Sequence, residues 1–246
     1  LEEVYQQYCQ YGERLAPLIR ETEFLVKQAL ERKESVLLEG AQGTLLDIDF
    51  GTYPYVTSSS PIAAGAYIGL GLSPSKLECV LGVFKSYTTR VGSGPMPTEL
   101  QDETGELIRE RAHEYGATTG RPRRCGWFDG VAASFSSRIN GFSGVALTRL
   151  DILDTFPSIK ICTGYKVDGD IIDQFPSRVA ILEKCEPVYE ELAGWQSPIG
   201  HVRRFEDLPH QAQSYVKRLE ELVACPVDLI SVGPKREETI IVRPVL

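Results

Sequence analysis

Residues 37–59, LLEGAQGTLLDIDFGTYPYVTSS, begin as an apolar run and then break into a segment rich in glycine and hydroxyl side chains. With the two residues before it, the run SVLLEG predicts a buried strand that ends at Gly40. Gly40 and Gly43 would let a ligand come close to the backbone, and Gln42 offers both a donor and an acceptor. A glycine-rich turn after a strand is also a common connector, so this stretch alone leaves both interpretations open.

Strands and helices alternate along the rest of the chain. Strands are predicted at ECVLGVFKSY (78–87), GVALTRLD (144–151), IKICTGY (159–165), VDLISVGP (227–234) and ETIIV (238–242), and helices at 60–72, 103–115, 128–142 and 207–226. Ser60 and Asp207 are the predicted caps of the first and last of these helices, with Pro61 at the first helical position. The alternation predicts an α/β fold with a largely parallel sheet flanked by helices, in which ligands bind at the carboxyl ends of the strands.

The first 34 residues have the pattern of an amphipathic connecting helix. Apolar residues recur mostly three or four apart from Val4 to Ile19, and Pro17 predicts a kink or a restart. The chain begins at Leu1, inside this pattern, which suggests a piece of a longer protein.

Composition narrows the class of protein. The net charge of −8 argues against a surface that coats nucleic acid, and no apolar run approaches the length of about 18 residues that spans a bilayer. The closest two of the six cysteines are 23 residues apart, and the three histidines form no metal-ligand pair. We therefore predict single buried thiols in a reducing cytosol and no metal site within this chain.

The segment GATTGRPRRCGW (116–127) brings three arginines together in a chain that is acidic overall. Arg121, Arg123 and Arg124 could form a clamp for carboxylate or phosphate groups, because guanidinium forks pair bidentately with such anions. The competing interpretation is a solvated basic turn that pairs with the surplus acids. Both stay open at this point.

Two strand ends carry the residues of a base-reading site. In LTRLD (147–151), Asp151 follows a strand, and its carboxylate could accept from the N1–H and the exocyclic amine of guanine while the stem of Arg149 lies along the base. In LISVGP (229–234), Ser231 and the backbone amides could close over a base edge. Each pattern is short enough to occur by chance, and the second is also an ordinary strand followed by a turn.

The chain has no GxxxxGK[ST] phosphate loop, since GAQGTLL lacks the lysine and GLGLSPSK has the wrong spacing. Nevertheless its motifs, in this order, closely resemble the adenylosuccinate synthetase family from about residue 35 to the end. The resemblance is carried by EGAQGTLLDIDFGTYPYVTSS (39–59), YTTRVGSGPMPTEL (87–100), GATTGRPRRCGWFD (116–129), TRLDILD (148–154) and SVGPKREETI (231–240).

The resemblance implies a reaction in which GTP, inosine monophosphate (IMP) and L-aspartate give GDP, phosphate and adenylosuccinate, with magnesium. It implies that this chain is the C-terminal portion of a fold related to P-loop GTPases. Residues 1–34 would form a connecting helix, and residues 35–246 would bind nucleotide and aspartate. The phosphate loop, the catalytic base and acid, the magnesium ligands and an arginine lent by the partner of a cytoplasmic homodimer would lie outside this chain. Alone, the chain is expected to be inactive.

The resemblance also assigns roles to single residues. Gln42, Arg121 and Arg123 would be catalytic. IMP would contact Gln42, Thr57, Val91 and Arg121; aspartate would contact Ala117, Thr118, Thr119, Gly120, Arg121, Pro122 and Arg123; and GTP would contact Arg123, Arg149, Leu150, Asp151, Ser231, Val232 and Gly233. Arg149 departs from the family, which often has lysine there.

Two alternatives belong to other classes. A non-catalytic module that binds GTP to regulate a partner would need no carboxylate clamp at 117–123. An RNA-binding domain would need interleaved aromatic residues and a basic surface, which the acidic composition disfavours.

Overall fold

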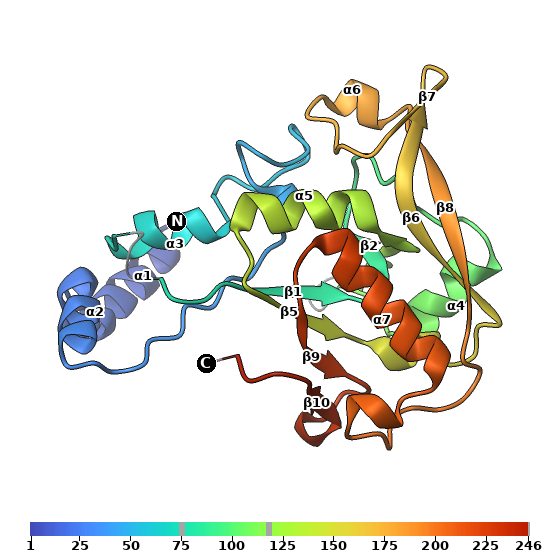
Figure 1. Ribbon diagram of the computed structural model, residues 1–246. Helices are drawn as coiled ribbons and strands as arrows, with labels where there is room; N and C mark the ends of the chain where they lie inside the picture. Colours follow the sequence, from blue (N-terminus) through green and yellow to red (C-terminus); the bar gives the residue numbers. More distant parts are fainter. Residues whose placement is uncertain (74–76, 117–119, 246) are drawn as a thin grey trace.

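The centre of the molecule is a four-stranded sheet in which three neighbouring strands run parallel (Figure 1). In the order β1-β5-β9-β10 the strands span Leu81–Lys85 (β1), Gly144–Thr148 (β5), Val227–Ser231 (β9) and Thr239–Ile241 (β10). Both β1 and β9 pair in parallel with β5, and β10 pairs antiparallel with β9 at the edge. This computed structural model describes residues 1–73, 77–116 and 120–245. The predicted α/β fold with a largely parallel sheet is confirmed.

Two helices pack on each other and share one core with the central strands. Helix α5 (Gly130–Asn140) begins where the Asp129 carboxylate accepts the Ala132 N–H at 3.0 Å. Helix α7 (His210–Val223) buries one apolar stripe with helical spacing, formed by Ala212, Tyr215, Val216, Leu219 and Val223. These side chains and those of β5 and β9 belong to one hydrophobic cluster, which fixes the position of the strand ends.

A second sheet stands beside the first and is mostly antiparallel. Its strands are β4 (Phe128–Asp129), β6 (Ser158–Val167), β7 (Asp170–Ile172) and β8 (Glu186–Ala193). The strand predicted at 159–165 is the middle of β6, but sequence analysis misses its long partner β8. The sequence EPVYEELA hides its strand character, because the proline and acids stand among the apolar residues and the stabilising cross-strand contacts come from β6.

Two short strands and one helix complete the part of the fold that carries the site. Strand β2 (Thr88–Arg90) pairs antiparallel with β3 (Arg124–Gly126), so that Arg90 lies opposite Arg124. Helix α4 (Glu103–Arg111) starts at Asp102, whose carboxylate accepts two backbone N–H groups. The chain also has a single helical turn, α6 (Val179–Leu182).

The N-terminal helices stand away from this core (Figure 1). Helix α1 (Glu2–Leu15) is followed by a 3₁₀ turn (Ala16–Leu18) and then by α2 (Thr22–Glu31), so the break predicted at Pro17 is confirmed. Neither helix buries a residue, and large apolar side chains such as Tyr5 (61% exposed) remain open to solvent. No helix in the described part of the chain is long and apolar enough to cross a membrane.

The strand predicted at SVLLEG does not form. Residues 35–40 have no strand beside them in the described ranges, and the Leu37 side chain is 90% exposed. An isolated extended segment gains neither ladder hydrogen bonds nor cross-strand contacts, so its apolar composition does not suffice to make a strand.

The cap predicted for the helix at 60–72 is also wrong. Helix α3 spans Ala63–Leu70, and the hydroxyl of Ser60 donates to the buried carboxylate of Asp47 at 2.5 Å. The Ala63 N–H instead donates to Asn140 Oδ1 at 2.7 Å. This partner comes from the far end of α5, where no local sequence pattern reveals it.

Two other helix ends differ from prediction. Helix α7 begins after Pro209 and not at Asp207, because Asp207 ends a separate 3₁₀ turn (Phe205–Asp207) and the extended Leu208 stands between the two. Helix α4 ends at Arg111 and not at residue 115, because His113 takes a left-handed conformation (φ 49°) that stops the helix.

All six cysteines are free. Four of them are buried as predicted, but Cys9 is exposed and Cys79 is half-buried. Cys9 is exposed because it lies on α1, which packs none of its residues into the core.

The stability of the fold depends on pH through Asp129. Its carboxylate is buried, caps α5 and accepts the Tyr165 hydroxyl at 2.7 and 2.8 Å. Burial raises the pKa of Asp129 to about 6 from its ordinary 3.8, against the opposing effect of these hydrogen bonds. Because the folded state binds the proton more tightly, this group's contribution to stability is full below pH 3.8 and is lost as the pH rises through about 6.

We therefore expect Asp129→Asn to stabilise the intact protein at neutral pH by about 1–3 kcal/mol, because the amide keeps the capping oxygen but cannot ionise. The gain should vanish near pH 4. Denaturant unfolding at about pH 4 and pH 7.5 measures it, and Asp102→Asn is the control for replacing an exposed capping carboxylate. An equal difference between parent and variant at the two pH values would contradict this account.

Candidate functional site

The carboxyl ends of β1, β5 and β9 meet at one edge of the parallel sheet. The residues at these ends are Lys85–Tyr87, Arg149–Asp151 and Val232–Gly233. The Ser86 hydroxyl donates to the Arg149 carbonyl at 2.7 Å, which ties the first two ends together. The two segments predicted to read a base, after β5 and after β9, therefore lie at the same edge.

Arg149 and Asp151 are held in different ways. Arg149 stands in a left-handed conformation (φ 62°), and its Nη1 donates to the carbonyl of Ala112 at 2.6 Å, so its guanidinium is anchored at the end of α4. Asp151 lies in a 3₁₀ turn (Leu150–Leu153), and its carboxylate accepts its own backbone N–H but no side-chain hydrogen bond in the described ranges. Burial raises the pKa of Asp151, while the charges of Arg149 and Arg111 oppose that rise. This half-buried carboxylate has its acceptor capacity open to a ligand.

The turn after β9 is a small closed unit. The Ser231 hydroxyl donates to the Gly233 carbonyl at 2.9 Å, and the buried Val232 donates its N–H to the Glu238 carbonyl at 2.9 Å. A Cβ on Gly233 would collide with the Glu238 carboxylate, which explains the glycine there. The turn therefore lies beside Asp151 in a fixed shape, and Glu238 is near enough to raise the pKa of Asp151 slightly.

The arginine segment is anchored by a residue that sequence analysis misses, Glu114. Its side chain is fully buried, and three donors reach it at 2.6 Å each: Lys85 Nζ and the Tyr87 hydroxyl at Oε1, and Arg123 Nη1 at Oε2. Burial alone would raise the pKa of Glu114, but these donors hold it below its ordinary value. The carboxylate therefore stays ionised among two cations.

The three arginines have different environments. Arg124 pairs with Glu99, its Nε donating to Oε1 at 2.8 Å, and Arg123 pairs with Glu114. Arg121 is exposed and has no ion pair within the described residues. Arg124, in β3, is therefore occupied by an acid of the chain, while Arg121 is open to an outside anion. Three predicted aspartate contacts, Ala117, Thr118 and Thr119, lie outside the described residues.

The remaining part of the arginine loop is closed at its base. Gly116 donates its N–H to the Arg121 carbonyl, and Gly120 donates to the Gly116 carbonyl, both at 2.8 Å. Pro122 lies opposite Tyr115 in an isolated bridge. These contacts place Arg121 and Pro122 at the base of the loop, where both stay exposed.

Val91 and Thr57 belong to segments that Arg90 joins. Because Arg90 faces Arg124 in the β2–β3 pair, Val91 leaves β2 at the end where the arginine loop enters β3. The Arg90 guanidinium also donates to Thr52 Oγ1 at 2.8 Å and to the Tyr55 carbonyl at 3.2 Å, which holds the segment carrying Thr57 beside β2.

Gln42 precedes a turn that contacts the segment of Thr57, whose N–H donates to the Leu46 carbonyl at 2.8 Å. Gln42 is exposed, just ahead of this 3₁₀ turn (Thr44–Leu46), and within the described residues no hydrogen bond joins it to Thr57 or Arg121. The same segment is also held at Thr44, whose hydroxyl accepts from Asn140 Nδ2 at 2.9 Å.

The sequence gives only a weak signal for Lys85 and Glu114, the two site residues that it does not predict. Lys85 lies near the end of the strand predicted at 78–87, at the edge where ligands bind, and that position could have suggested it. Glu114 stands between His113 and Tyr115 in a polar stretch, and nothing local shows that it is buried.

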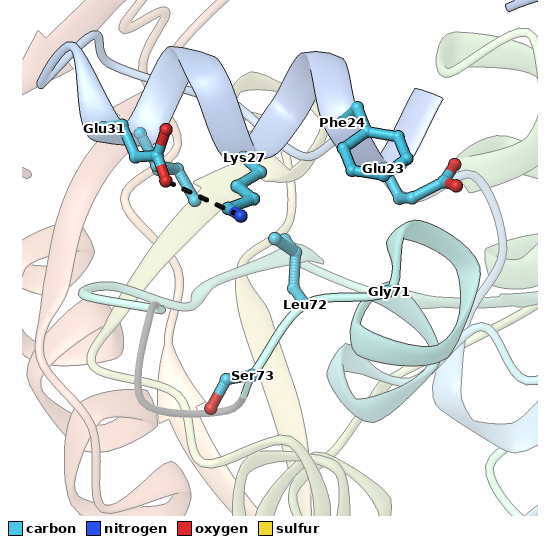
Figure 2. Close-up of a pocket in the computed structure, with 8 residues that line it drawn as sticks. Glu23, Phe24, Lys27, Glu31, Gly71, Leu72 and Ser73 are labelled. Carbon is cyan, nitrogen blue, oxygen red and sulfur yellow. Dashed lines mark ion pairs between the residues drawn. The ribbon is translucent and has the colours of Figure 1, made fainter. Parts of the chain in front are cut away.

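A separate cavity of about 340 Å³ lies between α2 and the segment after α3 (Figure 2). Glu23, Phe24, Lys27 and Leu72 are among its lining residues, and none of the predicted site residues is. Its Lys27–Glu31 ion pair is long (3.8 Å) and exposed, so this pair contributes little to stability.

No metal centre forms from the residues described. They contain no group of three or more histidine, cysteine, aspartate or glutamate side chains that could hold an ion. We assign no step to a metal here.

The fold and the site define an α/β protein with a cation-rich site at the carboxyl edge of its parallel sheet, next to a half-buried carboxylate. Comparison with known proteins identifies its family. The family model for adenylosuccinate synthetase matches residues 1–240, and the chain belongs to that family of purine-biosynthetic ligases.

The relatives are similar along nearly the whole of this chain. The adenylosuccinate synthetases of Geobacter sulfurreducens and Caldanaerobacter subterraneus subsp. tengcongensis are each 54% identical over 98% of it. A fully ligated adenylosuccinate synthetase from Plasmodium falciparum superposes with a TM-score of 0.95 at 40% identity, over 98% of this chain and 58% of that one. The chain spans 56% of the length of the two curated relatives.

Proposed function

We propose that the intact protein containing this chain joins L-aspartate to IMP at the expense of GTP and releases adenylosuccinate. The observation that carries the proposal is the junction at the sheet edge. Glu114 links Arg123 of the arginine loop to Lys85 at the end of β1, beside Arg149 and Asp151 at the end of β5. A base-reading carboxylate and a loop of cations for anionic groups thus adjoin, as this reaction requires. Family membership supports the same chemistry.

The proposed reaction has two steps. The C6 oxygen of IMP attacks the γ-phosphorus of GTP, GDP leaves, and a 6-phosphoryl nucleotide forms. The aspartate amine then adds at C6, gives up a proton, and phosphate leaves with the C6 oxygen. The base and acid for these proton transfers, the magnesium ligands and an arginine from the partner of a cytoplasmic homodimer are proposed to lie outside this chain.

The proposed roles follow the chemistry of each residue. Gln42 hydrogen-bonds near the reacting purine without adding charge, and Thr57 holds the 5′-phosphate of IMP. Val91 lies beside the ribose, and Arg121 binds the aspartate carboxylate and approaches that ribose. Arg123 stabilises charge on the GTP phosphates during transfer.

In this proposal residues 117–123 bind aspartate, with Thr118 and Thr119 donating hydroxyls to its carboxylates. At the other end of the site, Asp151 reads guanine. Leu150 lies beside the base, and the turn Ser231–Gly233 closes over its edge. The exposed position of Arg121 and the open carboxylate of Asp151 support these assignments.

The direct test is product formation by the intact protein from the three substrates, followed by absorbance or mass. Adenylosuccinate formation with GTP supports the proposal. GTP binding without ligation would favour a regulatory GTP-binding module instead.

Arg121→Leu should raise the Michaelis constant for aspartate about 10- to 150-fold and lower turnover, because a carboxylate loses a charge-assisted pair worth roughly 1.5–3 kcal/mol. The constant for GTP should move far less. Steady-state kinetics with each substrate varied in turn measure this split. Arg178→Leu, at another exposed arginine, is the matched control. A response of the GTP constant alone would exchange the roles of Arg121 and Arg123.

A further inference from the structure

Glu114 collects donors from separate segments of the chain. Lys85 ends β1, Tyr87 stands between β1 and β2, and Arg123 precedes β3; all three donate to the two oxygens of this one carboxylate. Burying an acid together with two cationic partners costs desolvation free energy, which is offset only where well-aligned hydrogen bonds reach the carboxylate oxygens. Here both oxygens are satisfied.

Arg123 is fixed by its backbone as well as by its side chain. Its N–H donates to the Glu114 carbonyl and its carbonyl accepts from Arg109 Nε, both at 2.8 Å, in addition to the ion pair with the Glu114 carboxylate. The Arg123 side chain nevertheless stays 29% exposed. Arg121, two residues earlier, accepts the Gly116 N–H at its carbonyl, but no ion pair holds its side chain among the described residues, so the loop joins a fixed cation to an open one.

The group carries an excess of positive charge. One carboxylate faces two cations, and the Arg149 guanidinium is close enough to affect the same lysine. Burial lowers the pKa of Lys85, the charges of Arg123 and Arg149 lower it further, and Glu114 opposes them. Lys85 donates to Glu114 and to Thr89 Oγ1 (2.9 Å), and its side chain is 27% exposed at the sheet edge. An incoming anion would therefore lower the electrostatic energy of this group.

We propose that Glu114 is a positioning residue that fixes Arg123 and Lys85 as a pair of cations for the phosphate groups of the nucleotide at the sheet edge. Lys85 is then a further phosphate-binding residue. The inference rests on the proposed function, in which Arg123 faces the phosphates of GTP.

Glu114→Gln in the intact protein tests the proposal, because glutamine has the same shape but presents an amide N–H₂ and no charge to its cationic partners. We expect kcat/KM for GTP to fall about 10- to 100-fold and the Michaelis constant for aspartate to change less than about threefold. Tyr87→Phe is the matched control: it removes one hydrogen bond to the same carboxylate, keeps both ion pairs, and should change GTP kinetics less than about threefold.

A double-mutant cycle separates positioning from general support of the fold. If Glu114 acts through Arg123 and Lys85, then Glu114→Gln should cause less loss of GTP kinetics in an Arg123→Leu background than in the parent, and little further loss once Lys85→Met is added. Hydrogen exchange at the Gly116, Gly120 and Arg123 amides should speed up in Glu114→Gln while α7 keeps its protection. Additive losses, equal effects on GTP and aspartate, or unchanged exchange at these amides would overturn the proposal.

The outcomes also distinguish a failure of the proposed function from a failure of the positioning role of Glu114. If Arg123→Leu leaves GTP kinetics unchanged, the proposed function has misplaced Arg123. If Arg123→Leu impairs GTP kinetics and Glu114→Gln does not, only the positioning role fails. Should Glu114→Gln not yield folded protein, Lys85→Met replaces it at a more exposed position: a loss confined to GTP supports the paired cations, and unchanged GTP kinetics overturns them.

Discussion

On its own, the 246-residue chain is expected to form no adenylosuccinate from GTP, IMP and aspartate. Its sequence contains no phosphate-loop lysine in the required spacing, and its described residues gather no metal site. A missing general base or acid typically costs a factor on the order of 10²–10⁴ each, and a missing phosphate and metal site removes most of the electrostatic stabilisation of phosphoryl transfer. The expected rate therefore falls below detection.

The isolated chain is also expected to self-associate. Helices α1 and α2 bury none of their residues, and Leu37 is 90% exposed in a segment that pairs with no strand in the described ranges. Exposed apolar surface of this kind favours association. Size-exclusion chromatography of the purified chain measures it, and replacing Tyr5 and Tyr8 by serine should reduce it.

The activity prediction is measured with highly purified chain, checked by mass for contaminating full-length enzyme. Adding a polypeptide that carries the remaining part of a family member should restore some turnover if the two parts dock. The intact family member, assayed in parallel, is the positive control. Turnover by the purified 246-residue chain alone would falsify this account.

Asp151→Asn is expected to weaken GTP binding to the intact protein by about 2–4 kcal/mol, or roughly 30- to 1000-fold. The Asp151 carboxylate accepts from the guanine N1–H and N2 amine in the proposed complex, and an amide can satisfy only one of these donors. Xanthosine triphosphate should bind better than before, because its C2 carbonyl accepts from the new amide N–H. The expected result is a change of base preference in addition to a loss of GTP affinity.

Competition between the two nucleotides measures that preference directly. Asp173→Asn, at an exposed aspartate after β7, is the matched control and should leave the preference unchanged. If Asp151→Asn alters neither GTP affinity nor the ratio of the two nucleotides, Asp151 does not read the base.

Strand positions could be read from the sequence because they depend on local pattern. Buried runs such as GVALT, bounded by Gly141 and Asp151, indicated β5, and the alternation with helices indicated a parallel sheet. The strands of a parallel sheet end at one common carboxyl edge, so the predicted sheet also indicated that Asp151 and Ser231 lie near each other at that edge. The same reasoning wrongly predicted a strand at SVLLEG, because a strand also needs a neighbouring strand. It missed β8, because only the pairing with β6 shows that EPVYEELA is a strand.

The sequence by itself therefore determined the fold class and the two segments at the edge of the sheet. Only the tertiary structure decided which charges meet. Lys85 and Arg123 are 29 and 9 residues from Glu114, and Arg124 is 25 residues from Glu99. Periodicity reports what one segment buries, whereas an ion pair depends on where two segments lie once the whole core has packed. That is why an acid in a polar stretch could become the buried centre of the site.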